Sequence, residues 1–173
     1  TPNRGDCLGV RGVARDLAAA GLGTLKPLAN GPVPGAFKSS IDVKLDFDTD
    51  HASACPYFVG RLIKGVANGE SPAWLKEKLL SIGLRPISAL VDITNLMTFD
   101  QNRPLHVFDA DKVSGDLHVR LSKSGETLLA LNDKEYTLDD EMTVIADDNG
   151  AEALGGVMGG EVSGVTAETV NVF

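Results

Sequence analysis

Cysteine is scarce in this sequence, with only Cys7 and Cys55 among 173 residues. Neither cysteine has a CxxC partner, so the sequence predicts neither a zinc site nor a redox motif. A single disulfide between them is compatible with this count, but two unpaired buried thiols are favoured, as is usual for cytoplasmic proteins. The histidines His51, His106 and His118 are scattered without a metal-ligand spacing, so we predict no metal site.

Long apolar runs and an excess of positive charge are also lacking. No stretch approaches the ~18 consecutive apolar residues of a membrane helix, and no apolar signal region stands at the start. We therefore expect a cytoplasmic protein without membrane contact. The chain has 24 Asp and Glu against 16 Lys and Arg, for a net charge of -8. A broad nucleic-acid surface would need a basic stripe to displace phosphate counterions, so any RNA contact should be local.

Both ends of the chain have the character of cut ends. The chain starts at Thr1 rather than Met, and residues 170–173 alternate apolar and polar side chains like a strand entering a core. We expect it to be a piece of a larger protein. At 43% hydrophobic residues, it is long enough for one domain, or for a compact domain with an appendage.

Periodicity separates a short first region from a longer second one. Apolar residues recur at helical spacing over 10–17, with Asp6 as candidate N-cap and Gly21 as the stop. Residues 21–40 are rich in Gly, Pro, Ala, Ser and Asn and are interpreted as a linker. The predicted regions are residues 1–40, an N-terminal helix with its linker, and residues 41–173, the main folded part.

The second region predicts both strands and helices. Ser71 and Pro72 are typical of a helix start, as N-cap and first helical residue, and Trp74, Leu75, Leu79 and Ile82 supply its apolar stripe up to Gly83. Ser88 is a candidate cap for a third helix that reaches about Phe99. Strands are predicted by alternation or turn spacing at 41–47, 57–65, 117–121, 127–131 and 144–146, with hairpin turns at 124–125 and 132–134. The predicted fold class is α+β, with mostly antiparallel sheet layers and a few packed helices.

Polar residues gather in and after the third predicted helix. Thr94 and Asn95 interrupt an apolar helix, where short polar residues are poor helix formers, and a polar loop leads to His106. Each also has a plain structural interpretation. Thr94 and Asn95 could bond back to the helix, and Asp92 could accept a bond near its start. His106 could be a half-buried packing residue and Arg85 a surface cation.

Four glycines stand within residues 155–160. The segment is neither a dinucleotide fingerprint, because no helix opens there, nor a P-loop, because no Lys-Ser/Thr follows. The glycines either permit positive φ angles in tight turns or let a ligand approach bare backbone. Without further context the structural interpretation is the safer one.

Several motifs, taken together and in order, resemble successive motifs of the beta subunits of bacterial-type phenylalanyl-tRNA synthetases. The matching segments span nearly the whole chain. They are residues 1–8 with the helix after them, 71–75, 83–86, Val91-Asp92-Ile93-Thr94-Asn95, Pro104-Leu105-His106-Val107-Phe108-Asp109 and Gly155-Gly156-Val157-Met158-Gly159-Gly160.

The resemblance implies a proofreading function. In this family the alpha subunit carries the aminoacylation centre, which uses ATP and magnesium, and the beta subunit hydrolyses tRNA wrongly charged with tyrosine. An apolar phenylalanine pocket rejects an analogue with one added hydroxyl only about 100-fold, so a second site must remove errors. The implied partners are the tRNA acceptor end, the alpha subunit and the rest of the beta subunit, in a heterotetramer. Residues 41–173 would be an editing-module core, truncated at its C-terminal end and without a cofactor of its own.

The resemblance also implies roles for six residues. His106 and Arg85 would be catalytic, with His106 holding or deprotonating a water and Arg85 near the terminal adenosine and ester. Thr94 and Asn95 would orient the aminoacyl group. Gly159 and Gly160 would bring backbone close to it, where their N–H groups could steady an oxyanion.

Two departures from the family pattern affect this expectation. The family's acidic residue that reads the tyrosine hydroxyl belongs to sequence downstream of Phe173, so little or no deacylation is expected from this chain alone. Asn102 and Arg103 stand where many members carry Gly-Gln. The alternative function is a non-catalytic scaffold or interaction module of the synthetase.

Overall fold

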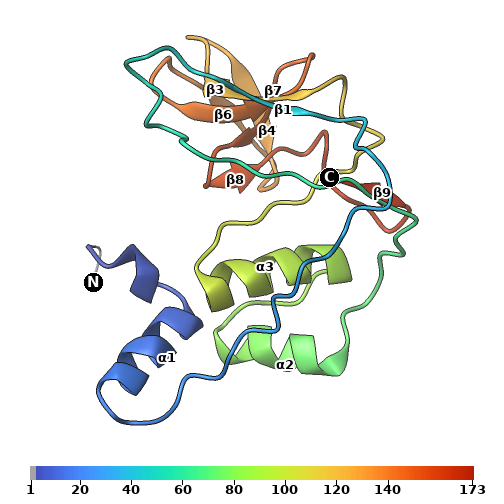
Figure 1. Ribbon diagram of the computed structural model, residues 1–173. Helices are drawn as coiled ribbons and strands as arrows, with labels where there is room; N and C mark the ends of the chain where they lie inside the picture. The colour runs from blue at the N-terminus through green and yellow to red at the C-terminus, as the bar shows by residue number, and fades with distance from the viewer. Residues whose placement is uncertain (1–2) are drawn as a thin grey trace. The chain divides into compact units, whose positions relative to one another are not determined.

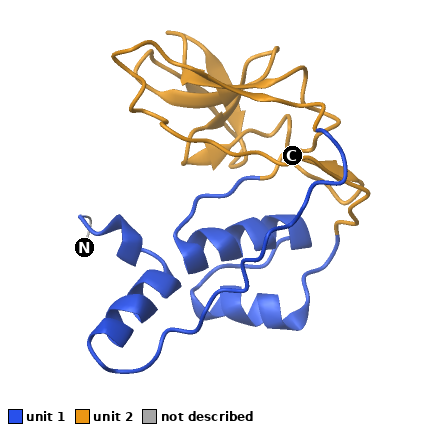
Figure 2. Ribbon diagram, in the orientation of Figure 1, with its two compact units in different colours: residues 1–38, 69–106 blue, residues 39–68, 107–173 orange. Residues whose placement is uncertain are grey.

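The computed structural model describes residues 3–173, which form two compact units (Figures 1 and 2). Unit 1 comprises Thr1–Lys38 and Gly69–His106, and unit 2 comprises Ser39–Asn68 and Val107–Phe173. The chain therefore passes from one unit to the other three times. Thr1 and Pro2 of the first resembling motif lie outside the described residues.

Unit 1 is helical. It contains the short 3-10 helix η1 (Gly5–Cys7) and the α-helices α1 (Val10–Ala19), α2 (Ala73–Ser81) and α3 (Ala89–Gln101). Both α1 and α2 pack against α3. Between α1 and the first strand the chain forms no helix or strand.

The boundaries of α1 differ partly from the prediction. Gly21 ends the helix with φ +77°, as predicted. Asp6 is not the N-cap, because α1 begins after Gly9 and the Asp6 carboxylate instead pairs with Arg4 and Arg15. Gly9 allows close packing on α3, since a Cβ there would lie 2.8 Å from the backbone N of Asn102.

Helix α2 begins one residue later than predicted. Pro72 occupies the N-cap position, and the Ser71 hydroxyl turns away to another partner. Leu75 and Leu79 are buried as predicted, whereas Trp74 and Ile82 are exposed, so half of the predicted stripe is wrong. The helix is followed by Gly83 at φ +83°, the predicted stop.

Helix α3 begins after Ser88, as predicted, although the Ser88 side chain makes no cap bond. The Ser88 backbone carbonyl accepts the Asp92 N–H (2.8 Å). The helix ends at Gln101, two residues beyond the predicted Phe99, and the left-handed φ of 53° at Asn102 turns the chain into the following loop.

Unit 2 contains the sheets. A five-stranded sheet has the order β1-β3-β6-β7-β8, β4 pairs with β5, and β2 pairs with β9. All these pairs are antiparallel except β1–β3, which is parallel. The predicted α+β class with mostly antiparallel strands is confirmed. The strand bounds are β1 Val43–Asp46, β2 Ile63–Lys64, β3 Leu117–Leu121, β4 Thr127–Ala130, β5 Lys134–Thr137, β6 Thr143–Ala146, β7 Ala151–Leu154, β8 Met158–Gly159 and β9 Asn171–Val172.

The strand predicted over 57–65 is wrong except for β2, because only Ile63 and Lys64 pair with a neighbour. Gly60, before it, lies against the Phe173 ring. The main core of unit 2 is formed by buried side chains from the sheet and its flanking segments: Ile41, Leu62, Phe108, Leu117, Val119, Ile145 and Ala153.

Two expectations concern the whole chain. Cys7 and Cys55 are free thiols, so the expectation that they are unpaired is confirmed, but both are half-buried and not buried as expected. Among the described residues, no helix combines the length and the apolar character that a membrane crossing requires.

Candidate functional site

The six residues expected to form the site are divided between the two units. Unit 1 contains Arg85, Thr94, Asn95 and His106, and unit 2 contains the glycines at 159 and 160 (Figure 2).

The helix that carries Thr94 and Asn95 is fixed by a buried carboxylate two residues before Thr94. Asp92 is 0% exposed. Its Oδ1 accepts the Ile87 N–H (2.9 Å) and its Oδ2 accepts the Ser71 hydroxyl (2.5 Å). The expectation that Asp92 accepts a bond near the helix start is confirmed. Through its bond with the Ile87 N–H, Asp92 also connects the segment just after Arg85 to the start of α3.

Thr94 and Asn95 are neighbours on α3, and both are half-buried. The Thr94 hydroxyl donates to the Val91 carbonyl (2.7 Å), the back-bond that its plain structural interpretation predicted. Because a threonine hydroxyl has one donor, this bond leaves only its oxygen lone pairs for a ligand. Thr94 can therefore accept a hydrogen bond from a substrate but cannot donate one without breaking its helix bond.

The loop that carries His106 is anchored to the same helix by a residue that the sequence analysis missed. The Thr98 hydroxyl donates to the Thr94 carbonyl (2.8 Å) and accepts the Leu105 N–H (3.2 Å). Thr98 thus connects the residue before His106 to the turn that begins at Thr94. Its signal in the sequence was a second threonine four residues after the first in an apolar helix.

His106 itself is half-buried, and Arg85 is exposed. Burial lowers the pKa of the His106 imidazole below its ordinary value of 6.5, because the interior disfavours the charged form. The ring is consequently neutral near pH 7, the state in which it can accept a proton. A neutral imidazole and an exposed guanidinium are suited to proton transfer and to anion binding, respectively.

The glycines at 159 and 160 are built into the edge of the unit 2 sheet. The Gly160 N–H donates to the Glu152 carbonyl (2.7 Å), so in this conformation it could bind an oxyanion only by giving up that bond. A Cβ at Gly160 would lie 2.7 Å from the Glu152 carbonyl oxygen and 2.9 Å from Leu128 Cδ1. Gly156, at φ +70°, turns the chain between β7 and β8. A tight turn therefore explains the glycine at 156, and close backbone approach explains the glycine at 160.

Beneath this glycine segment lies a buried acid that the sequence analysis also missed. Glu152 on β7 is only 4% exposed, and Ser163 is fully buried. Within residues 3–173, Glu152 Oε2 has no hydrogen-bond partner, while the hydroxyl and backbone N–H of Ser163 lie against the Glu152 carboxylate and oppose the rise of its pKa. Burial raises the pKa of Glu152, and the nearby charge of Asp147 raises it further. The only sequence signal was a glutamate between two alanines in a short strand.

Comparisons with known proteins give consistent matches. Residues 54–173 match the family model described as the B3/4 domain. The chain is 66% identical over 173 residues to the phenylalanine–tRNA ligase beta subunit of Paramagnetospirillum magneticum, covering 100% of this chain and 22% of that protein. It is 62% identical to the subunit of the same name from Ruegeria pomeroyi, again over the whole chain and over 21% of that protein. The chain thus spans about a fifth of the length of these curated relatives.

A solved structure is also similar. It is an N-terminal fragment of the phenylalanyl-tRNA synthetase beta subunit from Pyrococcus horikoshii, with a TM-score of 0.54 and 19% identity. The match covers 98% of this chain and 51% of that one. At this identity the likeness concerns the fold.

Proposed function

The chain belongs to the B3/4 domain family, and on that premise we propose that it is the editing part of a phenylalanine–tRNA ligase beta subunit. The proposed reaction is hydrolysis of the ester that joins tyrosine to the terminal adenosine of a mischarged tRNA. ATP and magnesium would serve the aminoacylation centre of the whole enzyme. The observation that carries the proposal is the half-buried imidazole of His106, in a loop that Thr98 anchors to the helix of Thr94 and Asn95.

In the proposed mechanism, His106 accepts a proton from the attacking water as the water oxygen bonds to the ester carbonyl carbon. The tetrahedral intermediate then loses the ribose oxygen, which takes the proton back from the imidazolium, and tyrosine and tRNA separate. Arg85 would hold the phosphate of the terminal nucleotide. Thr94 would accept a hydrogen bond from the substrate ammonium, and Asn95 would orient the ester.

The charge of the chain limits how it can bind tRNA. With a net charge of -8, the chain is unsuited to holding the tRNA body, because phosphate binding requires clustered cations. The acceptor end alone would enter the site, next to Arg85. The alpha subunit and the remainder of the beta subunit would hold the rest of the tRNA.

A second candidate function is a non-catalytic scaffold role, which one surface of unit 1 favours. Val10, Val13 and Leu17 follow one another at helical spacing on α1 and are 55%, 47% and 49% exposed. An exposed apolar row of this kind is typical of a protein interface. If the chain edits, substitutions of the polar residues of α3 and the following loop should change the hydrolysis of Tyr-tRNA. If it is a scaffold, they should not.

The test uses the complete alpha/beta ligase with His106→Ala in the beta subunit. Loss of a general base lowers a rate by about 10²- to 10⁴-fold, so hydrolysis of preformed Tyr-tRNA should slow by that amount. Phenylalanine charging should be unchanged. His51→Ala is the matched control, because His51 is exposed and lies in unit 2. Equal hydrolysis by His106→Ala and wild type would refute the mechanism, and a wild-type enzyme without hydrolysis would leave the scaffold role.

A further inference from the structure

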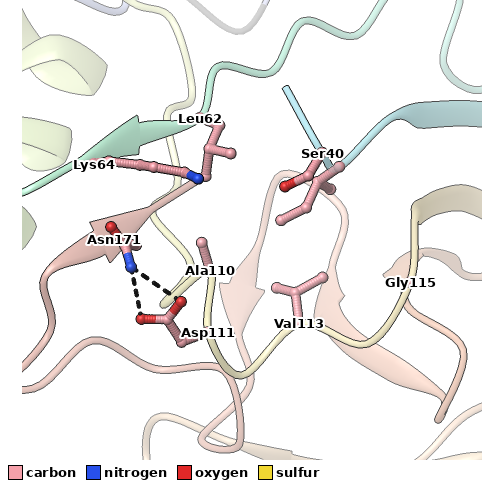
Figure 3. Close-up of a pocket in the computed structure, with 9 residues that line it drawn as sticks. Ser40, Leu62, Lys64, Ala110, Asp111, Val113, Gly115 and Asn171 are labelled. Carbon is pink, nitrogen blue, oxygen red and sulfur yellow. Dashed lines mark hydrogen bonds between the residues drawn. The ribbon is translucent and has the colours of Figure 1, made fainter. Parts of the chain in front are cut away.

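Unit 2 contains a cavity that none of the expected editing residues lines. Its volume is about 300 Å³. Four separate stretches of the chain form it, and Figure 3 shows their side chains around a common space. The lining residues are Ser40, Ile41, Leu62, Lys64, Ala110, Asp111, Val113, Gly115 and Asn171.

One end of the cavity carries a cation and an anion on a fixed framework. Lys64 and Asn171 are directly paired residues of β2 and β9. The Asn171 amide donates to both carboxylate oxygens of Asp111, at 3.1 and 2.9 Å (Figure 3). These two bonds fix the orientation of the carboxylate. They use about two of its roughly four acceptor positions, so it can still accept a ligand's donors.

Small and aliphatic residues border the rest of the cavity, but most of the surface exposed to it is polar. Leu62 and Ile41 belong to the buried core, and Ala110 and Val113 pack against it. In Figure 3 Val113 and Ser40 lie across the cavity from Lys64 and Asn171. Gly115 contributes no side chain, and its φ of +73° is a backbone conformation that favours glycine over other residues.

We propose that this cavity binds a free α-amino acid, with its carboxylate on Lys64, its ammonium on Asp111 and its side chain directed toward Val113. A volume of about 300 Å³ is at the small end of ligand pockets and suits one small molecule rather than a nucleotide. A simple anion would meet the Asp111 charge, and a simple cation would meet that of Lys64. A zwitterion is attracted by both. This inference is independent of the proposed editing reaction.

The proposal is tested by titrating the 173-residue chain with L-phenylalanine and L-leucine while following backbone amide resonances. Shifts should concentrate on the residues that line the cavity and should saturate. The two matched analogues are phenethylamine, which lacks the carboxylate, and 3-phenylpropanoate, which lacks the ammonium. Each should bind roughly 10-fold or more weakly, the equivalent of one lost charge-assisted hydrogen bond.

Two variants assign the charges. Lys64→Met and Asp111→Asn should each weaken binding by roughly 10-fold or more, whereas Lys134→Met, at an exposed position on β5, should not. A thermal melt and an unchanged amide spectrum outside the cavity check that each variant is folded. Absence of saturable shifts in the wild-type chain would overturn the proposal. So would analogues that bind as tightly as the amino acids.

Discussion

Replacing Asp92, whose carboxylate is buried, should lower the free energy of unfolding of unit 1 more than most other single substitutions in that unit. Replacing Asp92 with alanine leaves the Ser71 hydroxyl and the Ile87 N–H without their acceptor inside the protein. A hydrogen bond to a charged group contributes about 1.5 to 3 kcal/mol, so the two together are worth about 3 to 6 kcal/mol. Asp92 also lies in the first turn of α3, where a negative charge adds a few tenths of a kcal/mol or more.

The measurement is urea denaturation followed by circular dichroism, with hydrogen exchange of the Ile87 amide as a local readout. Typical domains are stable by about 5 to 15 kcal/mol, so Asp92→Ala should lower the midpoint strongly at an unchanged m value. The Ile87 amide should also exchange faster. Asp92→Asn keeps one acceptor but presents an NH₂ group to a donor, so its midpoint should lie between those of wild type and Asp92→Ala.

Two controls isolate the cause. Asp100→Ala removes a carboxylate from the last turn of the same helix, where negative charge is unfavourable, so it should be neutral or slightly stabilising. A double-mutant cycle with Ser71→Ala should give a coupling energy of about 1.5 to 3 kcal/mol. An Asp92→Ala loss below about 1 kcal/mol, with normal exchange at Ile87, would refute the assignment.

Three further perturbations have defined outcomes. Gly160→Ala should cost about 1 to 3 kcal/mol, because its Cβ would press on the Glu152 carbonyl. Gly69→Ala, with open space around it, should cost less in the same denaturation experiment. Burial raises the pKa of Glu152, so wild type loses stability as pH rises from about 4.3 through the folded-state pKa. Glu152→Gln should therefore gain stability relative to wild type as pH rises above about 4.3, and a difference that stays constant with pH would contradict the raised pKa. Thr98→Val should cost about 1 to 2 kcal/mol and deprotect the Leu105 amide in hydrogen exchange; unchanged exchange there would show that the bond is dispensable.

The parts of the fold that local rules determine were predictable. Gly21 and Gly83 end their helices at positive φ, and Asp133 turns the β4–β5 hairpin at φ +59°. The resemblance to synthetase beta subunits, which came from ordered local motifs, is confirmed by relatives that match the entire chain.

Long-range pairing could not be read from local patterns. The parallel pairing of β1 with β3 joins Val43 to Leu117, and nothing in either segment specifies its partner. Trp74 was placed in a buried stripe because periodicity reveals an apolar face but not whether another element covers it.

The candidate site was also predictable only in its local features. Sequence patterns indicated that Asp92 accepts a bond, but not that Ser71, 21 residues earlier, supplies it. The resemblance also implied oxyanion-binding N–H groups at the glycines, whereas the Gly160 N–H donates to the strand beside it. Hydrogen-bond partners of this kind depend on tertiary contacts, which a single sequence does not display. The roles of the six expected residues in editing stay predictions.

The threefold passage of the chain between the units constrains how the protein emerges from the ribosome. Unit 1 lacks α2 and α3 until His106 has been synthesised. The stretch Ser39–Asn68, already translated, must then wait for β9, because β2 pairs only with Asn171 and Val172. Neither unit can therefore complete its fold in the order in which its segments are translated. During synthesis there is an interval in which the 39–68 stretch lacks its partner strands and could be shielded by chaperones that bind nascent chains.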